Sequence, residues 1–201
     1  MSAVAIKSFG NPGCERQSMA SSHVWCGVVA WLMLACVLPS PAIADSGLDD
    51  YNVAVGLYKQ RRWKPAAEQF QVFLKTYKKH EKTPLAKLYL GLTRISLEEF
   101  TSARDILRLF VNENPQNVNV AQARYRIAEC SYLLNELATA RTEFDSYLRT
   151  FPRDPFQDHA LPYLADVQLR LNDPTSALAT FQKAMADFPD GPLVEDAKFG
   201  V

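Results

Sequence analysis

The sequence has few of the residues that enzyme chemistry requires. Only 3 of its 201 residues are histidine, and neither His80 nor His159 belongs to an HExxH or other metal-spaced cluster. We expect His80 on a solvated surface and His159 at a helix boundary. The sequence contains no glycine-rich phosphate loop and no GxSxG segment. We therefore predict a protein that is not an enzyme, with no catalytic residue, no metal site and no cofactor.

An excess of charge of one sign is also lacking. The chain has 22 basic and 22 acidic residues, so its formal net charge at pH 7 is zero. A surplus of positive charge would favour nucleic acid or an anionic membrane surface as a partner. We therefore expect no nucleic-acid partner, and a protein or peptide partner remains compatible with the composition.

The first 44 residues differ in character from the rest of the chain. Two basic residues, Lys7 and Arg16, precede an apolar run at residues 24–38. The run is followed by the helix-breaking PSP and then by AIA, which ends at Ala44. The run is shorter than the roughly 20 residues of a membrane-spanning helix, and AIA is typical of a signal-peptide cleavage site. We predict a signal peptide at residues 1–44, cleaved after Ala44, and an exported protein that is periplasmic or envelope-associated.

Cysteine is scarce beyond this leader. Cys14, Cys26 and Cys36 lie within the first 44 residues, and Cys130 alone follows them. Cys130 has no intramolecular disulfide partner in the exported chain, so we expect it to be a small buried core residue. An uncleaved anchor and lipidation at Cys36 are alternatives to cleavage, and we expect membrane association only through one of them.

What the sequence does contain is an internal repeat. From about residue 47 onward, residues of the same character recur every 37 positions. Two columns hold small residues, one holds Phe or Leu, and one ends the unit with proline. The small columns are Ala54, Gly91, Ala128, Ala165 and Ala66, Ala103, Ala140, Ala177; the Phe or Leu column is Phe70, Leu107, Phe144, Phe181; the prolines are Pro115, Pro152, Pro189.

Each unit is expected to form two amphipathic helices. Apolar residues recur at helical spacing in both halves of a unit, and a short polar turn separates the halves. The small residues let antiparallel helices approach to about 8 to 10 Å, while Phe or Leu fills the space beside them. We predict an all-α solenoid over residues 45–201. Its repeats are expected at about 47–83, 84–120, 121–157 and 158–194, with the start of a fifth at 195–201.

These columns resemble the tetratricopeptide repeat, over about residues 48–201. The resemblance implies a helical scaffold that binds other proteins. Two features depart from the family pattern: the period is 37 where the family has about 34, and the usual Trp of the first helix is replaced. The replacing residues are Asp50, Lys87, Arg124 and Leu161. The longer unit and the leader resemble the periplasmic subtype found in the Tol-associated cell-division coordinator and the outer-membrane β-barrel assembly lipoprotein.

The resemblance also implies that the first helices line a concave binding face. Two neighbouring columns place one tyrosine in each repeat on these helices, and charged residues follow. Tyrosine with arginine is typical of binding surfaces. The candidate partner-binding residues are Tyr51, Tyr89, Tyr125, Arg126, Glu129, Tyr132, Tyr163, Asp166 and Arg170. Alternatively, the tyrosines pack between neighbouring repeats.

These observations predict a non-enzymatic scaffold of the bacterial cell envelope that binds a peptide or protein partner in its concave groove. One alternative is the N-terminal targeting module of a longer envelope enzyme or machine. Another is a carbohydrate-binding module that contacts the cell wall through its tyrosines. The last residues, DAKFGV, are in register with the opening of a fifth first helix. We expect either a chain that continues or a partner, such as a second copy, that covers this edge.

Overall fold

The computed structural model describes residues 46–189 and 191, and this part of the chain forms eight α-helices and no β-strand. Each helix has 14 residues, and the first and second helices of the pairs both recur every 37 residues. The helices are α2 (Ser46–Lys59), α3 (Trp63–Thr76), α4 (Thr83–Ser96), α5 (Phe100–Glu113), α6 (Val120–Leu133), α7 (Leu137–Thr150), α8 (Gln157–Arg170) and α9 (Pro174–Asp187). The predicted all-α fold and its period are confirmed. The predicted leader and the start of a fifth repeat lie outside the described residues.

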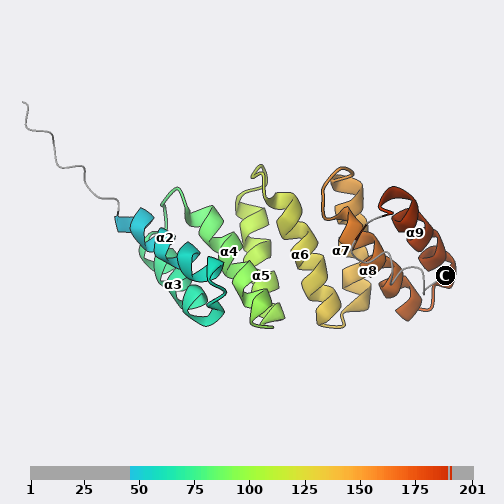
Figure 1. The fold of residues 1–201 in the computed structure, drawn as a ribbon, viewed down its shortest axis with the longest axis horizontal. Helices are drawn as coiled ribbons and strands as arrows, with labels where there is room; N and C mark the ends of the chain where they lie inside the picture. The colour runs from blue at the N-terminus through green and yellow to red at the C-terminus, as the bar shows by residue number, and fades with distance from the viewer. Residues whose placement is uncertain (1–45, 190, 192–201) are drawn as a thin grey trace, which may run out of the picture. The chain divides into compact units, whose positions relative to one another are not determined.

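The helices lie side by side in chain order, in a single row from α2 to α9 (Figure 1). Each helix packs against the next one along the chain. The first helices α2, α4, α6 and α8 also approach one another from repeat to repeat, whereas the second helices of this row do not. A row of helix pairs curves toward the side on which the helices of successive repeats lie closer together. The first helices therefore form the inner side of the row.

The turn inside each helix pair has the same backbone conformation four times. Its second residue always has a positive φ, which is strained for any residue with a side chain and least so for asparagine. The four residues are Arg61 at 57°, Glu98 at 61°, Asn135 at 60° and Asn172 at 62°. The last two repeats therefore use the residue that best tolerates this turn, and the first two do not.

The small residues of the repeat lie where the two helices of a pair touch. All the alanines of the two small columns are fully buried. Gly91 is at a tighter contact, because a Cβ atom placed on it would lie 2.6 Å from the side chain of Leu107. No larger residue fits there unless Leu107 moves. The α4–α5 pair thus combines glycine with leucine, where the other three pairs combine alanine with phenylalanine.

Two expectations about single residues have different outcomes. Cys130 is fully buried, and burial raises the pKa of its thiol to about 12, so it is a core residue as expected. His80 is half-buried, not fully solvated as expected: its ring centroid is 5.4 Å from that of Phe73, and its Nδ1 accepts the N–H of Lys82 at 3.0 Å. The loop after α3 turns back here, because the N–H of His80 donates to the Tyr77 carbonyl at 3.2 Å.

Candidate functional site

The predicted binding residues lie on the first helices, but two of the tyrosines face the core. Tyr51 and Tyr125 are only 7% and 1% exposed. The ring of Tyr125 stacks on Phe156 at 5.0 Å between centroids, and the ring of Tyr51 lies 5.7 Å from Phe73. Burial raises the pKa of both hydroxyls, that of Tyr51 to about 12. Packing between elements, the alternative stated above, describes these two residues, and neither presents a ring to a partner.

The other predicted residues form a connected set that includes one tyrosine that the sequence analysis missed, Tyr58. We call this set the first-helix row. Most of its side chains are half-buried, Arg170 is exposed, and Glu129 is 8% exposed. The first-helix row consists of Tyr58, Tyr89, Arg126, Glu129, Tyr132, Tyr163, Asp166 and Arg170.

The same arrangement of three aromatic rings occurs twice in and beneath this row. Tyr89 stacks on Phe70 of the preceding repeat at 5.9 Å with an interplanar angle of 4°, and Tyr58 lies edge-on to Tyr89 at 5.1 Å. Two repeats further on, Tyr163 stacks on Phe144 at 5.9 Å and 16°, and Tyr132 lies 4.9 Å from Tyr163. Ring pairs at these separations are mutually attractive. We call these groups the two aromatic modules, composed of Tyr58, Phe70, Tyr89 and of Tyr132, Phe144, Tyr163.

The aromatic modules leave several hydroxyl groups unused. Tyr58, Tyr89 and Tyr163 form no side-chain hydrogen bond to another described residue. Burial raises the pKa of the Tyr58 and Tyr163 hydroxyls, so both are neutral donors at physiological pH. The ring faces of Tyr89 and Tyr163 therefore pack between repeats, while their hydroxyl groups can still form hydrogen bonds with a partner.

A fixed guanidinium group lies between the two aromatic modules. Nη1 of Arg126 donates to both carboxylate oxygens of Glu129, at 2.9 and 2.8 Å. The guanidinium carbon lies 5.1 Å from the ring centroid of Tyr125 and 5.5 Å from that of Phe156, both within cation–π range. Because the ion pair and the rings already hold Arg126 in place, it loses little conformational entropy when it binds a partner.

A second polar group lies at the end of α6 and α8. The hydroxyl of Tyr132 donates to Asp166 at 2.8 Å, and Nη1 of Arg170 lies 3.6 Å from the same carboxylate. The guanidinium of Arg170 also lies 5.4 Å from the Tyr132 ring and donates to Asn135. Burial, and then the hydrogen bond to Asp166, raise the pKa of Tyr132. This group joins the third repeat to the fourth through side chains that are still partly open to solvent.

Tyr58 could have been found from the sequence. It occupies the same column of the repeat as Tyr132. Each of the two contacts a tyrosine of the following repeat: Tyr58 contacts Tyr89, and Tyr132 contacts Tyr163. Extending the column of Tyr132 back by two periods leads directly to Tyr58. The sequence analysis named Tyr132 alone from this column.

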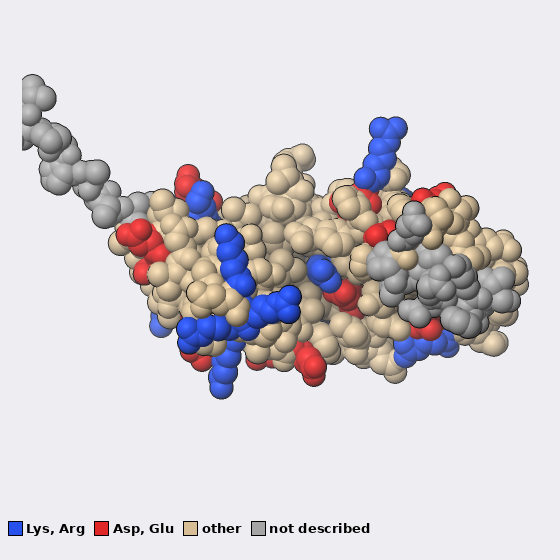
Figure 2. Space-filling model, in the orientation of Figure 1, with Lys and Arg blue, Asp and Glu red and all other residues tan. Residues whose placement is uncertain are grey.

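The described part of the chain shows no arrangement typical of a metal site, since it has no group of three or more His, Cys, Asp and Glu residues placed to hold an ion. On the face drawn in Figure 2, acidic and basic side chains are interspersed among uncharged ones. Within residues 46–189, no helix combines the length and the apolar character needed to cross a bilayer.

Comparison with known proteins supports this description. The sequence model of the tetratricopeptide repeat matches residues 122–154 and 160–191, which are the third and fourth helix pairs. A curated relative, the outer membrane protein assembly factor BamD of Rickettsia prowazekii (strain Madrid E), is 29% identical over 108 residues. That alignment covers 54% of this chain and 41% of the relative, so the chain spans less than half the length of that protein.

Solved structures share the fold at low identity. YrrB, described as a TPR protein with an unusual peptide-binding site, has a TM-score of 0.64 at 22% identity, over 77% of this chain and 76% of its own. PilF of Pseudomonas aeruginosa has a TM-score of 0.62 at 14% identity, over 78% and 68%. MamA of Desulfovibrio magneticus RS-1 has a TM-score of 0.60 at 18% identity, over 70% and 74%. At these identities the likeness is one of fold.

Proposed function

We propose that this chain, whose helical array contains tetratricopeptide repeats, is a non-enzymatic scaffold of the bacterial cell envelope. It binds an extended segment of a protein partner along the first-helix row. The observation that carries this proposal is the pair of aromatic modules, which places half-buried rings with unused hydroxyls on both sides of the fixed Arg126. A row of rigid side chains suits a chain-like ligand, because each ring adds contact area at low entropic cost.

The partner's chemistry follows from the row. Ring edges and faces favour apolar or proline side chains at two places, two repeats apart. Between them, Arg126 favours an acceptor, either a backbone carbonyl or a carboxylate, because Nη1 is engaged by Glu129 while Nη2 donates to no other described residue. The hydroxyls of Tyr58, Tyr89 and Tyr163 bond the polar backbone of a segment that lies along the row.

An envelope location is supported by two observations. The first 44 residues have the basic, apolar and small-residue order of an export signal. The name of the Rickettsia relative assigns that protein to outer-membrane protein assembly. We extend this location, and an assembly role with protein partners, to the present chain as part of the proposal.

The test is a pull-down from envelope extract with the full-length chain and two matched variants. The first variant is Tyr58→Phe/Tyr89→Phe/Tyr163→Phe, which removes the three unused hydroxyls and keeps the stacked rings. The second is Tyr51→Phe, which makes the same chemical change at a buried tyrosine outside the row. Circular dichroism confirms that both variants are helical.

We expect the wild type and the buried-tyrosine variant to retain one protein partner, and the row variant to lose most of it. A net contribution of about 0.5 to 1.5 kcal/mol per hydrogen bond gives a loss of tenfold or more for three hydroxyls. Equal retention by all three proteins would show that binding does not use the row. Retention on purified cell wall, with no protein partner, would favour the carbohydrate-binding alternative.

A further inference from the structure

On the side of the first helices opposite to the first-helix row, the residues of one column differ in their polar contacts from repeat to repeat. It is the column of Asp50, Lys87, Arg124 and Leu161. In the first repeat, Asp50 accepts the hydroxyl of Tyr77 at 3.0 Å, and in the second, Lys87 forms an ion pair with Glu113. Both partners come from the C-terminal end of the second helix of the same pair. In the fourth repeat, Leu161 is apolar and only 2% exposed, so it needs no polar partner.

Arg124 is the member of this column that has no partner in the described chain. No ion pair or hydrogen bond joins it to another described residue, and its Nε is shielded from solvent without an acceptor. Arg94, Arg104 and Arg126 have a shielded Nε too, but each donates to a glutamate through a terminal nitrogen. Among these four arginines, only Arg124 has no acceptor.

The register of the repeat identifies the group that is missing. The position of Glu113, the partner of Lys87, is held one repeat later by Thr150. The hydroxyl of Thr150 donates to the Ser146 carbonyl of its own helix at 2.7 Å. The third repeat therefore retains the cation of this column and lacks the carboxylate that accompanies the cation in the second repeat.

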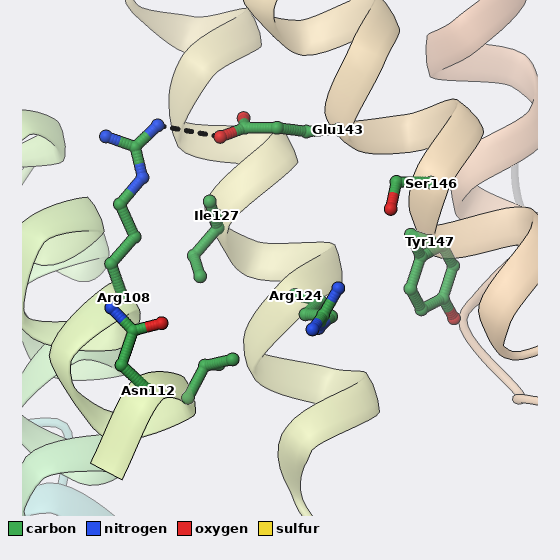
Figure 3. Close-up of a pocket in the computed structure, with 8 residues that line it drawn as sticks. Arg108, Asn112, Arg124, Ile127, Glu143, Ser146 and Tyr147 are labelled. Carbon is green, nitrogen blue, oxygen red and sulfur yellow. Dashed lines mark hydrogen bonds and ion pairs between the residues drawn. The ribbon is translucent and has the colours of Figure 1, made fainter. Parts of the chain in front are cut away.

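Arg124 lines a pocket of about 220 Å³ between α5, α6 and α7 (Figure 3). An engineered cavity of about 150 Å³ is large enough for benzene, so this pocket can hold a carboxylate with a small apolar group attached. Apolar atoms suitable for such a group come from Val111, Ile127 and the ring of Tyr147, and polar atoms from Asn112 and Ser146.

The pocket has one uncompensated positive charge, which suits a ligand with a single negative charge. Arg108 also lines it, but its Nη2 donates to Glu143 at 2.7 Å, and the Ser131 hydroxyl donates to the same carboxylate at 2.5 Å. In Figure 3 a dashed line joins Arg108 to Glu143, whereas Arg124 lies apart from both. One guanidinium thus remains unpaired, and its planar fork of donors matches a carboxylate group.

We propose that this pocket binds a carboxylate of a protein partner and that Arg124 forms the ion pair with it. Residues of an α-helix advance by about 100° each, so Arg124 and Arg126 project from nearly opposite sides of α6. The site is therefore separate from the first-helix row. Each proposal stands if the other fails.

The test is a titration of the full-length chain, labelled with ¹⁵N, with three small probes. N-acetyl-leucine presents a carboxylate at a chain end, and N-acetylglutamate α-amide presents one on a side chain. N-acetyl-leucine amide has the same apolar body as the first probe and no charge. The signal is the Arg124 Nε–H resonance, which is assigned by its absence from the spectrum of Arg124→Gln.

We expect the Arg124 resonance to shift and saturate with at least one carboxylate probe and to stay unchanged with the neutral amide. The probe that saturates at the lower concentration identifies the source as a chain end or an acidic side chain. In Arg124→Gln, binding is followed through the backbone amide resonances of the pocket residues Val111 and Ile127, and it should be weaker by about tenfold or more, because a charge-assisted hydrogen bond is lost. Arg149→Gln, the same substitution at an exposed arginine of α7, should leave binding unchanged.

A second variant keeps the proposal testable if Arg124→Gln perturbs the fold. Thr150→Glu restores the carboxylate that the second repeat has at this position, so it should pair with Arg124 and weaken binding of the probes about tenfold. An Arg124 resonance that ignores every carboxylate, or that responds equally to the neutral amide, would overturn the proposal. Unchanged binding in both Arg124→Gln and Thr150→Glu would do the same.

Discussion

The junctions between repeats are of two kinds, although the helices on both sides of them are in the same register. At the first and last junctions, a tyrosine stacks on the phenylalanine of the preceding repeat: Tyr89 on Phe70 and Tyr163 on Phe144. At the middle junction the equivalent residues are Arg126 and Leu107. The backbone repeat is thus constant, while at these two positions a pair of stacked rings is replaced by a charged and an aliphatic side chain.

The middle junction has directional contacts in addition to an apolar cluster. The last junction adds an ion pair in the equivalent columns, Arg141 with Asp173, to its stacked rings. Arg104, which is 8% exposed, donates to Ser131 at 3.1 Å and to both carboxylate oxygens of Glu136. Ser131 in turn donates to Glu143. Hydrogen bonds of this kind depend on geometry, whereas ring stacking tolerates small displacements. We infer that the outer junctions contribute more to stability and that the middle junction fixes how repeats two and three are oriented.

The largest expected effect is at an outer junction. Phe144→Ala removes a fully buried ring that packs against Tyr125 and Tyr163, and should lower the free energy of unfolding by about 3 to 5 kcal/mol. Urea denaturation followed by circular dichroism measures the change. Leu109→Ala, at a residue that is 46% exposed, is the control and should change stability by less than about 0.5 kcal/mol. A similar small change for Phe144→Ala would contradict the importance assigned to this junction.

An intermediate effect is expected where repeat two departs from the others. Gly91→Ala places a Cβ 2.6 Å from Leu107 and should cost about 1 to 3 kcal/mol of stability through overpacking. Adding Leu107→Phe recreates the alanine–phenylalanine pair of the other repeats. The double variant should therefore lose less stability than the sum of the single variants, by about 1 kcal/mol in a double-mutant cycle.

Gly56→Ala is the control for this cycle. A Cβ on Gly56 meets nothing within 4 Å, so the substitution should stabilise α2 by about 0.5 to 1 kcal/mol. If Gly91→Ala were as well tolerated as Gly56→Ala, the close contact between α4 and α5 would not be what selects glycine at position 91.

The fold could be predicted because its determinants recur in the sequence. Each small residue, each Phe or Leu and each closing proline appears several times at one spacing, so chance agreement is excluded by repetition. It was harder to predict which side chains of a first helix face the core and which face the binding surface. Tyr125 and Arg126 are adjacent in sequence and differ by about 100° around α6. Tyr125 belongs to the column of Tyr51, Leu88 and Pro162, which is buried in all four repeats, and Phe156 also stacks on it.

The polar contacts of the candidate site divide in the same way. The ion pair of Arg126 with Glu129 joins residues three apart on one helix, a spacing that can be recognised in a sequence. The missing partner of Arg124 depends on Thr150, at the end of a different helix. Arg104 and Glu136 are likewise far apart in sequence, and only the structure brings them together.

The smallest expected effect concerns the pH dependence of the middle junction. The hydrogen bond from Arg104 holds the pKa of the Glu136 carboxyl below its usual range. A carboxyl with a lowered pKa in the folded state stabilises the fold above its unfolded pKa of about 4.3, and this contribution is lost as pH falls through the folded value. Arg104→Met should therefore lower stability more at pH 7 than at pH 3, as measured by urea denaturation at both pH values.

Glu136→Gln isolates this contribution, because the amide keeps the shape of the side chain and does not titrate. In the Glu136→Gln background, the effects of Arg104→Met at pH 3 and at pH 7 should differ by less than in the wild type. The remaining difference comes from the charges of Glu143 and Asp105, which also act on Arg104. If the effect of Arg104→Met in the wild-type background were equal at the two pH values, the Arg104–Glu136 pair would contribute through packing alone. The middle junction would then differ from the outer ones in its residues but not in the physical basis of its stability.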